Sequence, residues 1–76
     1  MRCLINSFDK AREFVIVANQ CSGEIDVKQR HFIVDGKSIV GVMSLNLGQP
    51  VEVTCSDAKD ESLLSKFADE ERVLER

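Results

Sequence analysis

Several residue types that build specific binding sites are absent or scarce in this chain of 76 residues. It has no tryptophan and no tyrosine, only four phenylalanines, and one histidine. Proteins that bind nucleic acid usually stack bases on aromatic side chains and present a basic surface, whereas this chain has a net charge of −3. We therefore expect no nucleic-acid partner.

Long apolar runs are also missing. No stretch approaches the roughly 18 consecutive apolar residues of a membrane-spanning helix. Residues 1–5 are followed at once by polar Asn6 and Ser7, unlike the apolar core of a signal peptide. We expect a cytoplasmic protein without membrane contact. A chain of this length buries only about 60% of its unfolded surface, which predicts one domain over residues 1–76.

The cysteines do not form a recognisable pattern. Cys3, Cys21 and Cys55 are odd in number, far apart, and surrounded by apolar residues. Disulfide frameworks and zinc sites need paired or closely spaced cysteines. We expect three reduced, mostly packed thiols, with no metal and no cofactor.

Alternation of polar and apolar residues predicts four strands. They are expected at residues 1–5, 24–28, 32–34 and 51–56, with Gln29, Arg30 and His31 at the tip of the hairpin between the second and third. Three helices are expected between and after them, which gives the order β-α-β-β-α-β-α. This order predicts an α+β fold whose antiparallel or mixed sheet carries its helices on one face.

Helical spacing of apolar residues and capping signals define the three helices. The first is capped by Ser7 or Asp9, and the second runs from Ser38 to about Leu45. The charges of residues 69–72 and 75–76 are expected on the solvated face of the third. The apolar positions of the first and third helices are Ala11, Phe14, Val15, Ala18 and Cys21, and Leu63, Leu64, Phe67 and Leu74.

Gly36-Lys37-Ser38 matches the end of a phosphate-binding P-loop, but the rest of that motif is missing. The position that requires glycine is His31, and the chain is too short for the parallel sheet that carries such a loop. Ser38 is therefore expected to cap a helix, a role worth about 1 kcal/mol. A phosphate esterified to its hydroxyl would lie in the favourable field of the helix N-terminus.

Residues 37–45 resemble the Lys-Ser-Ile-Met-Gly-Val-Met-Ser-Leu signature of the HPr family, the histidine-containing phosphocarriers of the sugar phosphotransferase system. Only Val40 departs from it. The resemblance covers nearly the whole chain and implies the family's open-faced β-sandwich, a four-stranded antiparallel sheet covered by three helices. It also implies that Ser38 is a regulatory phosphorylation site and that Lys37, Ile39, Val40 and Met43 bind partner proteins. Val42 and Leu45 are the core candidates of this helix.

The chain departs from the family where phosphoryl transfer occurs. HPr proteins carry the phosphoryl group on a histidine, in a loop of the type Gly-x-His-x-Arg-Pro before the first helix. Here that loop holds only Asn6, Ser7, Phe8, Asp9 and Lys10. A carboxylate of Asp9 at the helix cap would also repel a phosphoryl group. The only histidine, His31, falls on the predicted hairpin tip, where we expect it to be solvated.

Three functional hypotheses remain open. The first is a non-catalytic HPr-like regulatory module, similar to the catabolite-repression type of HPr, with an HPr kinase, phosphotransferase-system proteins or a transcription regulator as partners. The second is a true phosphocarrier that uses His31. The third is an HPr-fold protein with an unrelated binding role, in which Ser38 is only a cap. An enzyme of another kind and an RNA-binding split β-α-β domain are disfavoured, since no catalytic cluster or stacking aromatics are visible.

Overall fold

The computed structural model describes residues 1–69, and the predicted Leu74 and the charges at residues 70–76 lie outside them. Its strands and helices come in the predicted order. Within the described part of the chain, no helix is long and apolar enough to span a membrane. The elements are β1 (Arg2–Leu4), α1 (Phe8–Ala18), β2 (Ile25–Gln29), β3 (Phe32–Asp35), α2 (Ile39–Met43), β4 (Pro50–Cys55), η1 (Ala58–Asp60), α3 (Glu61–Leu64) and η2 (Ser65–Phe67).

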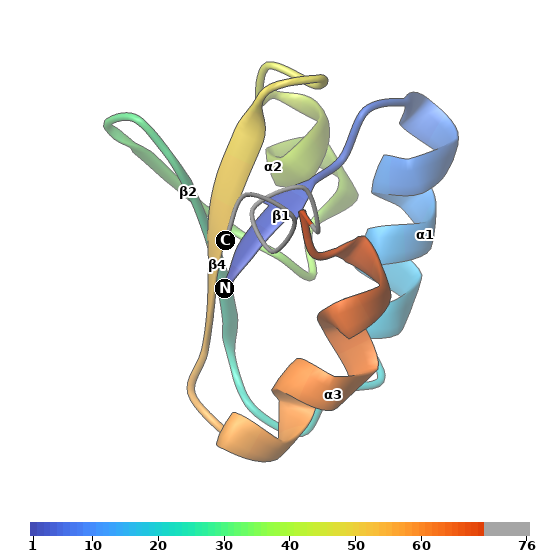
Figure 1. The fold of residues 1–76 in the computed structure, drawn as a ribbon, viewed down its shortest axis with the longest axis vertical. Coiled ribbons are helices and arrows are strands. Elements are labelled where there is room, and N and C mark those ends of the chain that lie inside the picture. The colour runs from blue at the N-terminus through green and yellow to red at the C-terminus, as the bar shows by residue number, and fades with distance from the viewer. Residues whose placement is uncertain (70–76) are drawn as a thin grey trace, which may run out of the picture.

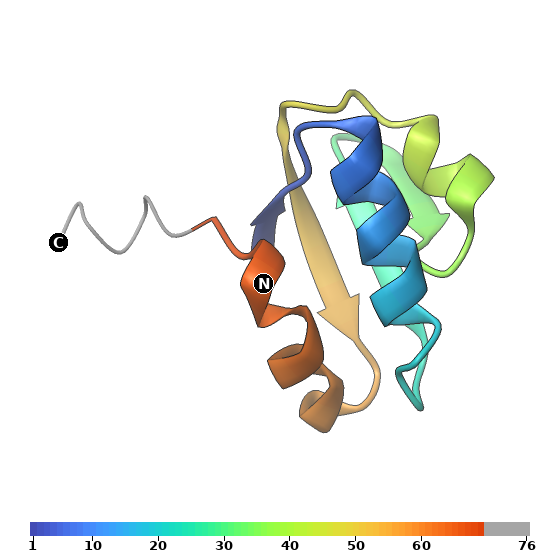
Figure 2. The same cartoon turned by 90° about the vertical axis from the view of Figure 1, so that its right-hand side faces the viewer.

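The four strands form one antiparallel sheet in the order β1-β4-β2-β3. Figure 1 shows the sheet nearly edge-on at the left, with α1, α2 and α3 to its right. In Figure 2, α2 lies beside α1 in front of the sheet. The expected α+β architecture, helices on one face and an open sheet face on the other, is confirmed.

The core lies between the sheet and the helices. Alternate residues of β2 and β4 point into it, and the apolar face of α1 covers them. Phe14 of α1 meets Phe67 of η2 edge to face, with ring centroids 5.2 Å apart. The buried apolar residues are Cys3, Ile5, Ala11, Phe14, Val15, Ala18, Cys21, Ile25, Val27, Val42, Leu45, Val51, Val53, Leu64 and Phe67.

The hairpin tip is shorter than expected. Gln29 belongs to β2, where it pairs with Phe32, so the turn consists of Arg30 and His31. The Gln29 side chain is buried, and it donates to the carbonyl of Asn46 at 3.0 Å and accepts from the backbone N–H of the same residue at 2.8 Å. Gln29 lies on the same face of β2 as buried Ile25 and Val27, and these bonds satisfy its polar side chain there.

The last helix differs most from the prediction. Instead of continuing toward Leu74, the helical segment ends at Phe67, and Ala68 is extended. Ala68 forms a bridge with Cys3, and the backbone N–H of Asp69 donates to the carbonyl of Arg2 at 2.9 Å. The backbone of residues 68–69 therefore pairs with the edge of β1 instead of continuing the helix. Leu63, predicted on the apolar stripe, is exposed.

Candidate functional site

Ser38 caps α2, as expected. Its backbone is extended, and its hydroxyl accepts a hydrogen bond from the backbone N–H of Gly41 at 3.1 Å. Its own N–H donates to the carbonyl of Asp35 at 3.0 Å, and its carbonyl accepts from Val42 at 3.0 Å. The half-buried side chain thus lies at the point where β3 turns into α2, in a fixed conformation.

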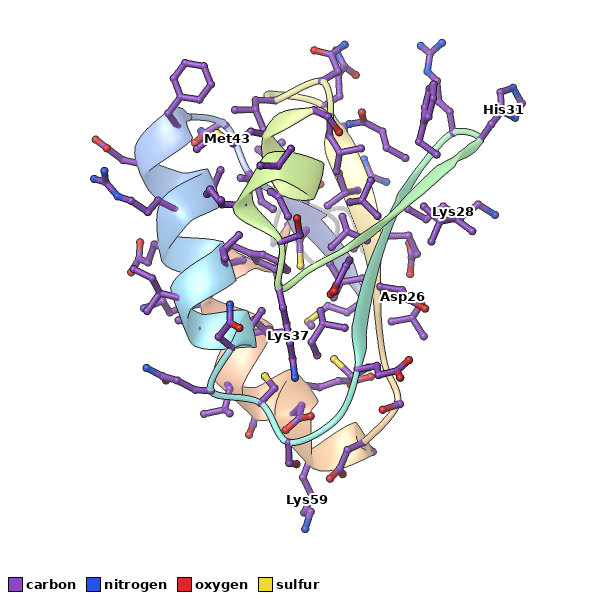
Figure 3. The ribbon with its side chains drawn as sticks, turned by 180° about the vertical axis from the view of Figure 1, so that it is seen from behind. Asp26, Lys28, His31, Lys37, Met43 and Lys59 are labelled. Carbon is purple, nitrogen blue, oxygen red and sulfur yellow. The ribbon has the colours of Figure 1, made fainter. Side chains whose placement is uncertain are left out.

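The segment before Ser38 is held from two sides. The Asp35 carboxylate accepts from the backbone N–H of Lys37 at 2.9 Å, and the Asn19 amide donates to the Lys37 carbonyl at 3.1 Å. The Lys37 ammonium donates to the carbonyl of Cys21 at 3.2 Å. Figure 3 shows the Lys37 side chain running from the start of α2 toward the turn that follows α1. The end of α1 therefore positions the start of α2.

The apolar side chains of α2 divide into two groups. Val42 and Leu45 are buried, as expected for core residues. Val40 is 77% exposed and Ile39 39% exposed, while Met43 is half-buried. Ile39, Val40 and Met43 line a shallow apolar hollow on the surface, together with Ser44. These three apolar residues are here called the α2 patch.

The start of α1 is capped by Ser7 rather than by Asp9. The Ser7 hydroxyl accepts from the backbone N–H of Lys10 at 3.1 Å. Asp9 lies in the first turn of α1 and forms an exposed ion pair with Arg12 at 3.1 Å. Of the two expected caps, Ser7 is therefore the one observed, and the Asp9 carboxylate adds negative charge to the first turn.

Phe8, the first residue of α1, is 68% exposed. Figure 3 shows Met43 on the side of α2 that faces this start of α1. No role for Phe8 was predicted, although its position directly after a capping serine was the available signal. It extends the exposed apolar surface near the α2 patch.

His31 lies at the tip of the β2–β3 hairpin, where it is exposed. In Figure 3 the hairpin tip is on the opposite side of the molecule from the start of α1. Within the described residues, His31 makes no hydrogen bond or ion pair. Geometry therefore does not bring the histidine to the helix start, where the family's transfer chemistry occurs.

The three cysteines are free thiols, as expected. Cys3 is fully buried, and burial raises its pKa to about 11, although the nearby N-terminal ammonium opposes the shift. Burial also raises the pKa of Cys21 and Cys55. Since the thiolate is the reactive form, these groups are poor nucleophiles at neutral pH. No group of three or more metal-ligating side chains occurs in residues 1–69.

One buried carboxylate was not anticipated. Asp60 accepts hydrogen bonds from the backbone N–H of Gly23 at 2.9 Å and of Ser22 at 3.3 Å. It joins the turn after α1 to the start of the last helical segment, and its burial was hidden because it lies in a run of charged residues. Its role is structural.

Comparison with known proteins supports the arrangement. The sequence model of the family described as "PTS HPr component phosphorylation site" matches residues 9–70. No curated protein sequence matches the chain. The match begins at Asp9, within the loop in which the chain departs from the HPr pattern.

Solved HPr structures have the same fold. Phosphocarrier protein HPr from Bacillus anthracis is 25% identical, with 90% of this chain and 89% of that chain aligned and a TM-score of 0.71. The catabolite-repression protein Crh of Bacillus subtilis is also 25% identical, covering 86% and 77% with a TM-score of 0.66. HPr-C-His from Thermoanaerobacter tengcongensis, at 22% identity, covers 92% and 90% with a TM-score of 0.77. The chain therefore belongs to the HPr family of the phosphotransferase system.

Proposed function

We propose that this protein is a regulatory HPr-family module that binds partner proteins through the α2 patch and is switched by phosphorylation of Ser38. It acts in the cytoplasm as one domain and does not carry phosphoryl groups on a histidine. The observation that carries the proposal is the position of the Ser38 hydroxyl at the head of α2, directly beside exposed Ile39 and Val40.

The α2 patch and the hydroxyl suit a charge-controlled interface. Exposed apolar side chains in a shallow hollow provide contact area for a partner. A phosphate on Ser38 would add a charge of about −1.5 to −2 next to that area, together with strong acceptor oxygens. Such a group either recruits a basic partner or repels an acidic one, so a single modification changes the binding preference. Lys37, the other residue expected to bind partners, does not line this hollow, because its side chain runs toward the turn after α1 and its ammonium donates to the Cys21 carbonyl.

The loop before α1 supports a regulatory role over a carrier role. It has no histidine, and the Asp9 carboxylate lies in the first turn of the helix whose N-terminus would have to hold a phosphoryl group. Like charges in such a place destabilise the phosphorylated form. The likeness to Crh, a catabolite-repression protein, favours the same role.

Phosphorylation of Ser38 is tested with purified HPr kinase and ATP. We expect mass spectrometry to find one added phosphate and to locate it on Ser38, and we expect Ser38→Ala to remove it. Ser44→Ala is the matched control, because Ser44 is an exposed serine at the other end of α2. No phosphate on the wild-type chain, under conditions that modify an ordinary HPr, would contradict the proposal.

The carrier alternative is tested separately with phosphoenolpyruvate and the general phosphotransferase enzyme. We expect no acid-labile label on the chain. A labile phosphate on His31, formed at a useful rate and lost in His31→Ala, would replace the regulatory proposal with a phosphocarrier function.

A further inference from the structure

The outer edge of β3 is an unpaired strand edge. β3 lies at one end of the sheet, and β1 lies at the other. The β1 edge is partly covered, since Ala68 bridges to Cys3 and Asp69 donates to the carbonyl of Arg2. Within residues 1–69, nothing pairs in this way with β3. An open strand edge is a template for another strand.

The register of the hairpin shows which backbone groups of β3 point outward. Gly36 donates to the carbonyl of Ile25 at 2.7 Å, which makes these two a hydrogen-bonded pair. Because such pairs alternate along an antiparallel ladder, Phe32 and Val34 also bond to β2, and the groups of Ile33 point away from it. The N–H and C=O of Ile33 have no hydrogen-bond partner within residues 1–69.

This edge is apolar at its middle and polar at its ends. Phe32 is 66% exposed and Ile33 is 64% exposed. At one end, exposed Asp35 lies directly opposite exposed Asp26 of β2. Like charges in opposite positions destabilise a strand pair. At the other end lies exposed His31, whose imidazole can donate a hydrogen bond to a carboxylate.

We propose that a second copy of this chain pairs antiparallel with β3, with Ile33 on the two-fold axis. In this register the N–H and C=O of Ile33 bond to the C=O and N–H of the partner's Ile33. His31 then lies opposite the partner's Asp35, and Asp35 opposite the partner's His31, on the same face of the sheet as Ile33. The two sheets join into one with eight strands.

Complementarity between a hydrogen-bond donor and a carboxylate acceptor selects this partner and this register. The strand carries its acceptor and its donor at opposite ends, so an antiparallel copy brings each carboxylate to an imidazole. Each of these contacts also places the partner's imidazole N–H beside the two carboxylates of Asp26 and Asp35. Centring the axis on Val34 would place Asp35 opposite the partner's Ile33, so the carboxylate would gain no donor from the partner beyond the Lys37 N–H that it already has. The contact area of one short strand is small, so the dimer is weak.

Sedimentation equilibrium of the full chain, from about 20 μM to about 1 mM, tests the proposal in the range where weak dimers dissociate. We expect the average mass to rise toward twice the chain mass, and backbone amide shifts to change with concentration at residues 31–35. A chain that stays monomeric at the highest concentration would overturn the proposal.

Ile33→Pro removes the outward N–H without breaking a bond to β2, as prolines on edge strands do. We expect it to raise the dimer dissociation constant about tenfold or more, since two symmetric hydrogen bonds are lost. Ile33→Val keeps the N–H and is the matched control. Ile16→Ser, which changes an isoleucine that is 55% exposed on α1, should have no effect on dimerisation.

Exchanging the charges tests the register without proline. His31→Asp places two carboxylates in opposition and should also raise the dissociation constant. His31→Asp combined with Asp35→His recreates the imidazole–carboxylate contact across the axis and should restore much of the affinity. A dimer that survives both Ile33→Pro and His31→Asp uses a different surface, and this result would exclude the β3 pairing.

Discussion

The hydroxyl of Ser38 accepts a hydrogen bond from the backbone N–H of Gly41 at 3.1 Å, so the proposed phosphorylation site is also the cap of α2. The two roles require different properties of the Ser38 hydroxyl. The cap needs an acceptor, whereas the kinase needs a free hydroxyl. Phosphorylation therefore exchanges this contact for one made by the ester or phosphate oxygens.

Ser38→Ala removes the cap, and we expect it to lower the free energy of unfolding by about 1 kcal/mol. Ser38→Asp keeps an acceptor at the same position and should lose much less. Urea denaturation of the three proteins measures the difference. Equal stabilities of the wild type and Ser38→Ala would show that the Gly41 N–H finds another acceptor.

Asn19 connects the two helices that frame the α2 patch. Its amide donates to the carbonyls of Val15 at 2.8 Å and of Lys37 at 3.1 Å. We expect Asn19→Ala to lower the free energy of unfolding by about 1 kcal/mol and to increase hydrogen exchange at the start of α2. Gln20→Ala, at the neighbouring exposed position, is the control and should change neither quantity.

Asp60 holds two backbone N–H groups of the turn after α1, and its side chain is buried. We expect Asp60→Ala to destabilise the protein by roughly 2–3 kcal/mol, because both donors lose a charged partner in a poorly hydrated place. Asp57→Ala is the comparison and should cost less, since the Asp57 carboxylate makes only exposed contacts, as the cap of the 3-10 turn η1 and as acceptor from the Ser22 hydroxyl at 3.1 Å. Thermal unfolding that ranks Asp57→Ala as the more damaging change would contradict this assignment.

The buried thiol of Cys3 predicts a loss of stability at alkaline pH. Burial raises its pKa to about 11 from the ordinary value of 9.0. A group whose pKa is raised in the fold stabilises below its unfolded pKa, and this contribution disappears as pH rises toward the folded pKa. We expect a fall of roughly 2 kcal/mol in the free energy of unfolding between about pH 9 and pH 11.

Urea denaturation at several pH values measures this decline, and Cys3→Ala separates it from the titration of other groups. The variant is less stable at pH 7, because it leaves a cavity, but its stability should depend less on pH over the same range. Parallel pH profiles for the variant and the wild type would refute the role of this thiol.

Much of the fold follows from local sequence signals. Alternation identified the strands, and Ser7 and Ser38 marked the starts of two helices. The core residues of α1 and β4 could be assigned because period 3.6 and period 2 were both unbroken there. The signature at residues 37–45 led to the HPr family, which the match over residues 9–70 confirms.

Other features depend on contacts between distant segments, and no local pattern encodes them. The helical stretch ends at Phe67 because the backbone of residues 68–69 pairs with β1, about 65 residues away along the chain. Gln29 and Asp60 are buried because loops brought by the fold supply their hydrogen bonds.

The sequence by itself determined the order of the elements and Ser38 as the cap of α2, since these depend on residue spacing and short-range hydrogen bonds. Only the tertiary structure decided where the last helical segment ends and that His31 lies far from the start of α1. It also decided which edge of the sheet stays open. These properties depend on how elements pack, so they follow from the free energy of the whole chain and not from any one segment.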